Sequence, residues 1–166
     1  MKPKIILLIK HKKEEQFLRT RTVPFDFSKF EKKTIEETVK KMREIMKKAN
    51  GIGLSANQVG IPYRFFVAQV PDTQGKQKFY AIFNPEITKV SKDEVETVEE
   101  GCLSVPDTYG LVERAYRLIL GGQDKRGKKI KIKAWGLLAR VFQHEVDHLD
   151  GKLFIDKAKE THVIES

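Results

Sequence analysis

The sequence predicts an α+β fold with small antiparallel sheets, an amphipathic helix near the N-terminus and a second helix near the C-terminus. Two observations lead to this class. Apolar residues recur at helical spacing in two stretches, one near each end of the chain. Between them lie short runs rich in β-branched and aromatic residues, divided by turn residues. Two helices that enclose a block of short strands favour antiparallel sheets.

The N-terminal helix is expected within residues 25–49, after an irregular lead-in. Two capping boxes compete for its start, Thr34 with Glu37 and Ser28 with Glu31, so its first residue stays open. The helix should bury a single apolar stripe, formed by Ile35, Val39, Met42, Met46 and Ala49.

Five strands are expected in the middle of the chain, each a run of apolar and β-branched residues. Turn signals separate them at Gly75, at Asn84-Pro85 and at residues 125–127. The expected strands are Arg64 to Val70, Lys78 to Phe83, Glu94 to Val98, Tyr116 to Gly121 and Lys128 to Ala134.

Length and composition limit the kind of protein. The 166 residues fit one domain, residues 1–166, with one core. The apolar run at residues 5–9 is too short for a membrane span or a signal-peptide core, so we expect a cytoplasmic protein. Cys102 is the only cysteine, which excludes an intramolecular disulfide.

The net charge of +9 is unevenly distributed. Residues 1–50 hold 15 Lys and Arg against 7 Asp and Glu, whereas residues 51–166 hold 17 against 16. The basic N-terminal third fits either an anionic partner such as nucleic acid or a solvated lysine-rich surface.

The second helix is expected from Gly136 to Asp150 and carries an HExxH motif. His144 and His148 lie four residues apart, so on a helix they share one face and can converge on one metal ion. Glu145 follows the first histidine, where a carboxylate can accept a proton from a water molecule activated by the metal. Two ordinary histidines without a metal are the alternative.

The third ligand decides which kind of metal site this is, because HExxH alone is typical of metallopeptidases. A metzincin would have its next ligand at position 154, which is Phe154 here. A downstream glutamate, as in thermolysin-like enzymes, would have to come from a very short tail. The ligand should therefore lie upstream, and Cys102 is a better candidate than His11 or His162, which have no site-like neighbours. A thiolate and two imidazoles leave one position open for catalysis.

Two glycine-containing loops add further candidates. Gly101 permits close approach of the backbone, so the Leu103 amide is expected to point into the site. Gln58 is a candidate donor to a developing oxyanion. Residues 51–56 also match a dinucleotide-binding pattern, but they follow a helix and lead to a strand, which is the reverse of the required context.

Three segments together resemble the peptide deformylase family, metalloenzymes that remove the formyl group from nascent chains. They are GIGLSANQ at residues 51–58, EGCLS at residues 100–104 and QHEVDHLDG at residues 143–151. Their order and the overall length match the family, and the likeness is clearest from Met42 to Asp156.

The resemblance implies an α+β fold in which small antiparallel sheets pack around the central C-terminal helix that bears the HExxH motif. It also implies a role for each matching residue. The ion is expected to be Fe²⁺ in the cell, replaceable by Ni²⁺, Co²⁺ or Zn²⁺, and its ligands would be Cys102, His144 and His148. Glu145 would act as general base and then as proton donor, while Gln58 and the Leu103 amide would stabilise the oxyanion. The residues expected to bind the peptide and its methionine side chain are Gly53, Val98, Glu100, Gly101, Leu137 and Val141.

The resemblance also implies partners, namely N-formyl-methionyl nascent peptides and a transient association with the ribosome, without a membrane or a specific nucleic-acid sequence. Three departures from the family pattern stand out. Ser55 replaces an alanine, residues 12–17 replace a proline-containing segment, and the chain ends soon after Asp156. Some relatives use a longer basic C-terminal helix for ribosome docking, so the basic first 50 residues would have to take that role here.

Four other interpretations remain open at the level of the sequence. A metallopeptidase would cleave peptide bonds, and a hydrolase with Cys102 as nucleophile would survive a chelator. A basic binding protein with a structural metal would need neither Glu145 nor Gln58 and would favour four protein ligands. A deacylase or amidase would act on another N-acyl group.

Overall fold

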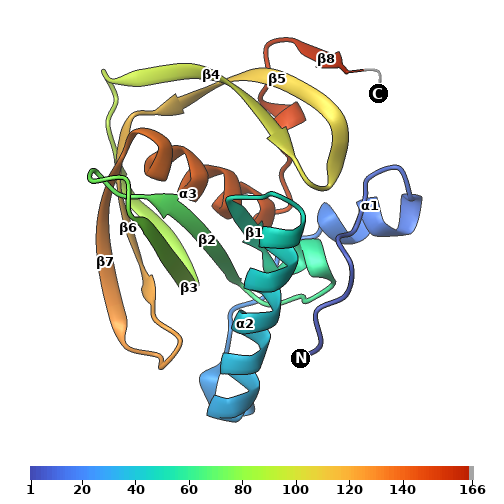
Figure 1. Ribbon diagram of the computed structural model, residues 1–166, viewed down its shortest axis with the longest axis vertical. Helices are drawn as coiled ribbons and strands as arrows, with labels where there is room; N and C mark the ends of the chain where they lie inside the picture. The colour runs from blue at the N-terminus through green and yellow to red at the C-terminus, as the bar shows by residue number, and fades with distance from the viewer. Residues whose placement is uncertain (165–166) are drawn as a thin grey trace.

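The computed structural model, which describes residues 1–164, has two antiparallel sheets on either side of helix α3 (Gly136–Leu149) (Figure 1). This arrangement confirms the predicted α+β class. The larger sheet has the strand order β1 (Gly53–Ser55), β2 (Phe65–Pro71), β3 (Gln77–Val90), β6 (Arg117–Gln123) and β7 (Lys129–Trp135). The smaller sheet has the order β4 (Val95–Cys102), β5 (Val105–Ala115) and β8 (Thr161–Val163).

Helix α3 is held in place by its apolar side, which packs against the larger sheet. Phe142 is fully buried, and its ring lies 5.6 Å from that of Phe66 and 5.4 Å from that of Tyr80. Burial of aromatic side chains of this size makes a large contribution to core stability. Within the described residues, neither α3 nor any other helix is long and apolar enough to cross a membrane.

Helix α2 (Lys32–Lys48) buries four residues of the predicted apolar stripe against the larger sheet, namely Ile35, Val39, Met42 and Met46. Ala49, the fifth, is the half-buried C-cap, and the helix also begins differently from the prediction. Its N-cap is Glu31, whose side chain makes no capping hydrogen bond, so both predicted capping boxes are wrong. Ser28 lies instead in a separate 3₁₀ turn, where its backbone N–H donates to Asp26 Oδ1 at 3.0 Å. Because Asp26 binds Ser28 in this turn, Ser28 cannot serve as the N-cap of α2.

All five predicted strands exist, with ends shifted by one or more residues, and β3 and β4 are clearly longer than predicted. The turn expected at Asn84-Pro85 is wrong, because β3 continues through it with an irregular register between Phe83 and Glu86. Asn84 adopts a φ of 48°, and its side chain accepts from the backbone N–H of Phe25 and donates to the carbonyl of the same residue. These bonds compensate for the interrupted ladder.

One α-helix, α1 (Lys12–Leu18), and three strands, β1, β5 and β8, were not predicted, and neither were the three 3₁₀ turns of the described residues. Strand β5 contains Pro106, Asp107 with a φ of 58°, and Gly110, which locally resemble a loop. Its hairpin with β4 brings Cys102 opposite Val105. Cys102 therefore lies at the end of β4, on the side of the smaller sheet that faces α3.

Candidate metal centre

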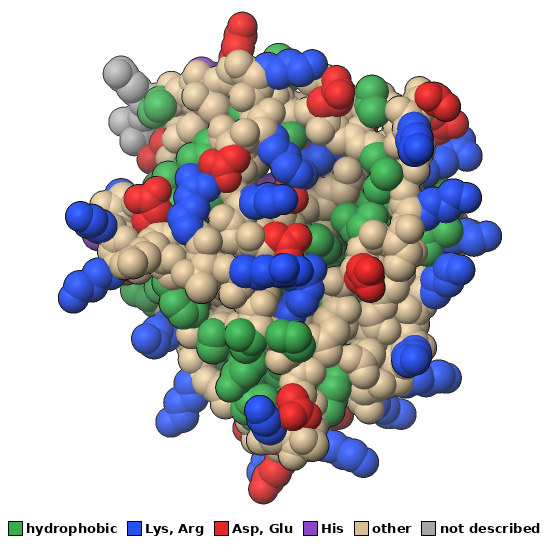
Figure 2. Space-filling view, turned by 180° about the vertical axis from the view of Figure 1, so that it is seen from behind, with side chains coloured by type: hydrophobic (Ala, Val, Ile, Leu, Met, Phe, Trp, Pro, Cys, Tyr) green, Lys and Arg blue, Asp and Glu red, His purple; other side chains and the backbone are tan. Residues whose placement is uncertain are grey.

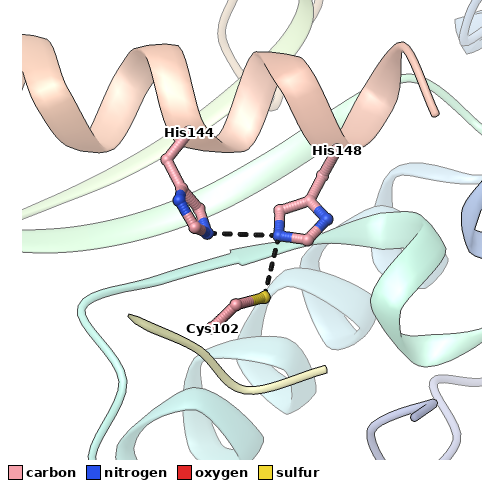
Figure 3. A group of neighbouring side chains, drawn as sticks. All are labelled: Cys102, His144 and His148. Carbon is pink, nitrogen blue, oxygen red and sulfur yellow. Dashed lines mark hydrogen bonds between the residues drawn. The ribbon is translucent and has the colours of Figure 1, made fainter. Parts of the chain in front are cut away.

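Three ligand side chains meet between α3 and the end of β4 (Figure 3). Cys102 Sγ lies 3.1 Å from His148 Nε2, which lies 3.2 Å from His144 Nε2. Within the described residues this is the one group of His, Cys, Asp or Glu side chains close enough to hold an ion. The three predicted ligands are thus brought together, whereas His162 pairs with Glu99 at 3.4 Å and lies outside the group.

The chemistry of these donors fits a divalent transition metal. Burial alone would raise the pKa of the Cys102 thiol, but His148 and His144 outweigh it and hold that pKa well below its usual value. Burial likewise opposes charge on His144, yet Cys102 and Glu100 raise its pKa to about 10, so an ion that binds Nε2 must displace a proton from this ring. A thiolate and two neutral imidazoles that share one point form a ligand set suited to Fe²⁺, Co²⁺, Ni²⁺ or Zn²⁺.

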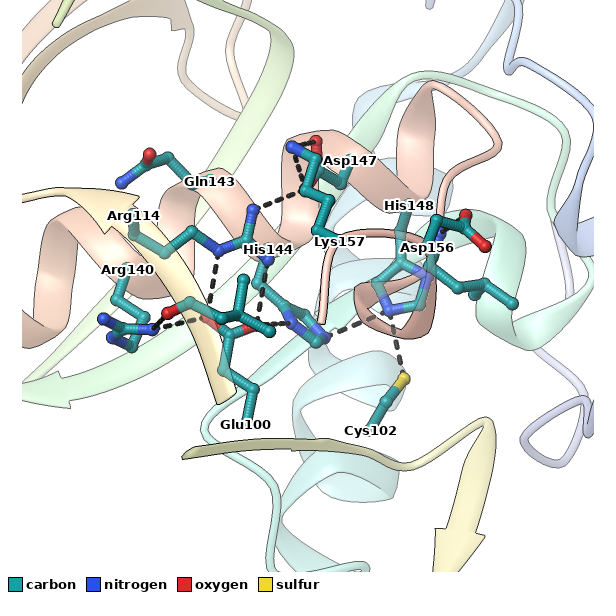
Figure 4. A network of polar contacts seen from close by, with 12 residues as sticks. Glu100, Cys102, Arg114, Arg140, Gln143, His144, Asp147, His148, Asp156 and Lys157 are labelled. Atoms are coloured by element: carbon teal, nitrogen blue, oxygen red, sulfur yellow. Dashed lines mark hydrogen bonds and ion pairs between the residues drawn. The ribbon is translucent and has the colours of Figure 1, made fainter. Parts of the chain in front are cut away.

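Glu100 orients one of these ligands (Figure 4). Its carboxylate accepts two hydrogen bonds from Arg114, each at 2.9 Å, and one from Arg140 at 2.7 Å. The second oxygen also lies 3.0 Å from His144 Nδ1. A carboxylate on Nδ1 fixes the ring so that Nε2 is free to bind metal. We expected Glu100 to bind substrate, but these contacts occupy both of its oxygens and favour a positioning role.

Arg114→Ala is expected to lower the free energy of unfolding by about 3 kcal/mol, the low end for a broken buried ion pair, because Glu100 and Asp147 lose the cation that they share and keep only Arg140 and Lys157. Arg114 is 3% exposed and contacts both Glu100 and Asp147. Urea denaturation measures the change. The control is Arg117→Ala, which removes an exposed pair with Glu94 and should cost about 0–1 kcal/mol. Equal losses of unfolding free energy in the two variants would contradict the claim that Arg114 stabilises the fold more than Arg117 does.

Glu145 projects from α3 into the cavity beside the three ligands and is 3% exposed. Burial raises the pKa of its carboxyl group, against the opposing charges of His144 and His148. The Ser55 hydroxyl donates to Glu145 Oε2 at 2.6 Å, so the residue that departs from the family's alanine holds this carboxylate. One carboxylate oxygen is thereby anchored in the pocket.

Gly53 is required beside this carboxylate, because a Cβ atom built on Gly53 would overlap Glu145 Oε1. Gly53→Ala is therefore expected to displace Glu145 and lower kcat on the order of 10–100-fold, with the fold retained. Steady-state kinetics and circular dichroism measure the two effects. Gly121→Ala is the matched control, since its Cβ would lie 3.7 Å from Thr88 and meets no clash. Wild-type kcat in Gly53→Ala would contradict this role.

Gln58 is fixed next to the ligand sulfur by a 3₁₀ turn, Ala56–Val59. Its Oε1 accepts from the Ser55 backbone N–H at 2.9 Å, and its Nε2 lies 3.1 Å from Ser104 Oγ and 3.6 Å from Cys102 Sγ. The side-chain N–H group therefore faces the site, as an oxyanion donor must. The bond from the Ser55 N–H to the Gln58 side chain is one half of a capping box, which was not predicted, although a serine followed three residues later by a glutamine is its sequence signal. The Ser55 hydroxyl does not complete the box and donates to Glu145 instead.

A cavity of about 580 Å³ opens onto this cluster, a size typical of ligand pockets. Leu103 and all of the residues expected to bind the peptide line it: Gly53, Val98, Glu100, Gly101, Leu137 and Val141. Sequence reasoning missed Ile52, Asp107 and Tyr109, which also line it. Strands β1 and β4, each terminal in its own sheet, border the cavity on two sides.

A Cys-His-His cluster beside the carboxylate of an HExxH helix defines a metal-dependent hydrolase. Comparison with known proteins gives the family. The model for polypeptide deformylase matches residues 5–163, and the chain belongs to this family, whose members are metallohydrolases that act on a formamide bond.

Individual relatives agree with this assignment. Peptide deformylase of Thermodesulfovibrio yellowstonii is 46% identical over 123 residues, which cover 74% of this chain and 73% of the relative. Peptide deformylase of Agrobacterium fabrum is 50% identical over 116 residues, covering 69% and 67%. The crystal structure of peptide deformylase from Thermotoga maritima superposes with a TM-score of 0.83 at 35% identity, covering 96% of this chain and 100% of that one.

Proposed function

We propose that the Cys102 site removes the N-formyl group from the N-terminal formyl-methionine of nascent polypeptides, releasing formate and a free α-amino group. The observation that carries this proposal is the position of Glu145, buried beside Cys102, His144 and His148 at the base of one cavity in a member of the deformylase family.

The cavity suits the end of an extended peptide. Because β1 and β4 are terminal strands, each has an edge that can pair with the backbone of a substrate strand. The apolar side chains of Val98, Leu137 and Val141 line the same cavity and would receive the methionine side chain. Gly101 cannot carry a side chain here, since a Cβ atom would overlap the ring of Tyr109.

Cys102, His144 and His148 would hold the metal ion, which we propose to be Fe²⁺ in the cell and replaceable by Ni²⁺, Co²⁺ or Zn²⁺. When bound, such an ion supplies Lewis acidity, lowering the pKa of water and polarising a carbonyl group. The Glu100 carboxylate keeps His144 in the orientation that this binding requires.

Glu145 would move the proton in the reaction. Its carboxylate accepts a proton from the attacking water and then delivers that proton to the departing amine, which is otherwise a poor leaving group. Gln58 Nε2 and the Leu103 amide would donate to the oxygen of the formyl group as negative charge develops there. The Gln58 side chain is held by Ser55 and Ser104 before reaction, so little energy would be lost in reorienting it.

Nascent chains are made in the cytoplasm, and we propose that the enzyme works there and associates transiently with the ribosome. The excess of Lys and Arg over Asp and Glu, 32 against 23, supports an encounter with a polyanionic assembly.

Formate release from an N-formyl-methionyl peptide tests the proposed function. Protein loaded anaerobically with Fe²⁺ or Ni²⁺ should release formate rapidly, and a chelator should abolish the release. The matched N-acetyl peptide distinguishes a broader deacylase, and mass spectrometry detects any cleavage of peptide bonds. Activity that survives the chelator would indicate Cys102 as nucleophile. A folded, metal-loaded protein that releases no formate would contradict the proposal.

A further inference from the structure

The outer face of β6 and β7 carries a row of cations far from the metal centre. Lys129, Lys131 and Lys133 alternate with the partly or fully buried Ile130, Ile132 and Ala134, so all three lysines point away from the core. Alternate residues lie roughly 6.8 Å apart along a strand, so the row extends over roughly 13 Å. Such a row matches an extended anionic chain better than a single phosphate group.

An exposed aromatic residue ends this row. Trp135 is 52% exposed, lies directly opposite Arg117 on β6 and is the only tryptophan of the chain. Trp135 lines a hollow together with Val90, which is 42% exposed, so it is not a single scattered apolar side chain. Its position in line with the lysines places a flat apolar surface next to a row of positive charge.

Two hollows lie along this face of the sheet. Their floor is formed in part by Ile119 and Gly121 of β6, which stand opposite Lys133 and Lys131 of β7. Lys89 of β3 lines the opposite wall of one of them. The hollows contain five Lys or Arg side chains and one acid: Lys89, Arg117, Lys129, Lys131, Lys133 and Glu86.

The positive charge is denser on this face than over the rest of residues 51–166, which hold 17 Lys and Arg against 16 Asp and Glu in all. Residues 117–135 hold seven Lys or Arg and one acid. Arg117 is engaged by Glu94 at 2.8 Å, but within the described residues the three lysines of β7 have no ion-pair partner. Figure 2 shows Lys and Arg side chains along its right-hand edge, the side on which β6 and β7 lie when the molecule is seen from behind.

Charged residues on an edge strand also prevent aggregation, and β7 is an edge strand. That explanation accounts for the β7 lysines alone. It does not account for Lys89, which belongs to an inner strand, or for Trp135, which would favour aggregation. A cluster of lysines also attracts an anionic membrane. The regular spacing of the three lysines along one strand, with the exposed ring of Trp135 at its end, favours a linear chain of phosphates and bases over a lipid surface.

We propose that this face, the β6–β7 trough, binds single-stranded RNA. The lysines would contact successive phosphates, and a base would stack on Trp135, the combination typical of single-strand binding without sequence preference. This binding is independent of the metal centre, because the trough shares no residue with the catalytic cavity.

The test uses the full, metal-loaded chain and a labelled oligoadenylate of roughly 12 nucleotides. We expect fluorescence anisotropy to show binding that weakens with salt, accompanied by quenching of the Trp135 emission. The triple variant Lys129→Glu, Lys131→Glu, Lys133→Glu should lose more than tenfold in affinity and lose the quenching, while its deformylation rate is unchanged. Because glutamate keeps the edge strand charged, this variant retains protection against aggregation.

The matched control reverses three exposed lysines of α2, Lys40→Glu, Lys41→Glu and Lys48→Glu, with the same change in net charge. It should keep its affinity and the quenching. Equal losses in both triple variants would show that binding follows net charge alone and would overturn the proposal. Binding of anionic phospholipid vesicles in place of RNA would overturn it too. Should the first triple variant fail to fold, Lys131→Glu alone must still reduce affinity.

Discussion

Glu145→Gln is expected to retain the metal and lose nearly all turnover. Glutamine keeps the size of the side chain and can still contact Ser55, but it can neither accept a proton from water nor deliver one to the amine. General acid–base catalysis contributes typically 10²–10⁴-fold, and Glu145 would serve in both directions, so a loss of at least about that size is expected. Formate release measures kcat, and elemental analysis measures the bound metal.

The control for this variant is Glu99→Gln, which removes a half-exposed carboxylate at the rim of the same cavity. It should keep kcat within a small factor of the wild-type value, because Glu99 lies away from the ligand cluster. Kinetics like those of the wild type in Glu145→Gln would remove Glu145 from the mechanism. Loss of metal in that variant would assign it a structural role instead.

Cys102→Ala is expected to abolish both metal retention and activity. The variant removes one of three ligands, and loss even of an outer-shell partner typically costs 10–100-fold in metal affinity or activity, so more than about 100-fold is expected here. Equilibrium dialysis against a competing chelator measures the affinity. His162→Ala removes a histidine outside the cluster and should bind metal normally. A Cys102→Ala enzyme that holds metal as tightly as the wild type would exclude the thiolate as a ligand.

The helix that carries the site was predictable because its signal is local. Residues four apart on a helix share a face whatever surrounds them, so HExxH alone places His144 and His148 side by side. Cys102 was predictable only by elimination of downstream ligands. Its approach to the histidines depends on the β4–β5 hairpin, and β5 was missed because Pro106, Asp107 and Gly110 resemble a loop.

The errors share one physical cause, namely that a distant partner decided the local structure. Asn84 continues a strand because its side chain forms two hydrogen bonds with the Phe25 backbone, and these replace the bonds that the sheet lacks at this point. The expectation that Glu100 meets substrate stays a prediction, but Arg114 and Arg140, which arrive from other elements, bind its carboxylate and favour a positioning role. Charge averaged over residues 51–166 came to +1 and concealed the strongly basic β6–β7 trough, which becomes visible only when alternate residues are assigned to one face.

The proposed metal ligands come from two layers of the molecule, and this has a consequence for the lifetime of the protein in the cell. An ion held by β4 and α3 closes the chain between Cys102 and His144 into a ring, as a covalent staple would. Ions that bind the folded chain preferentially also shift the folding equilibrium towards it. Enzyme that is made when metal is scarce should therefore unfold more often, and proteases should degrade it sooner. A shortage of metal would then reduce the number of enzyme molecules as well as the activity of each, and nascent chains would retain their formyl groups for both reasons.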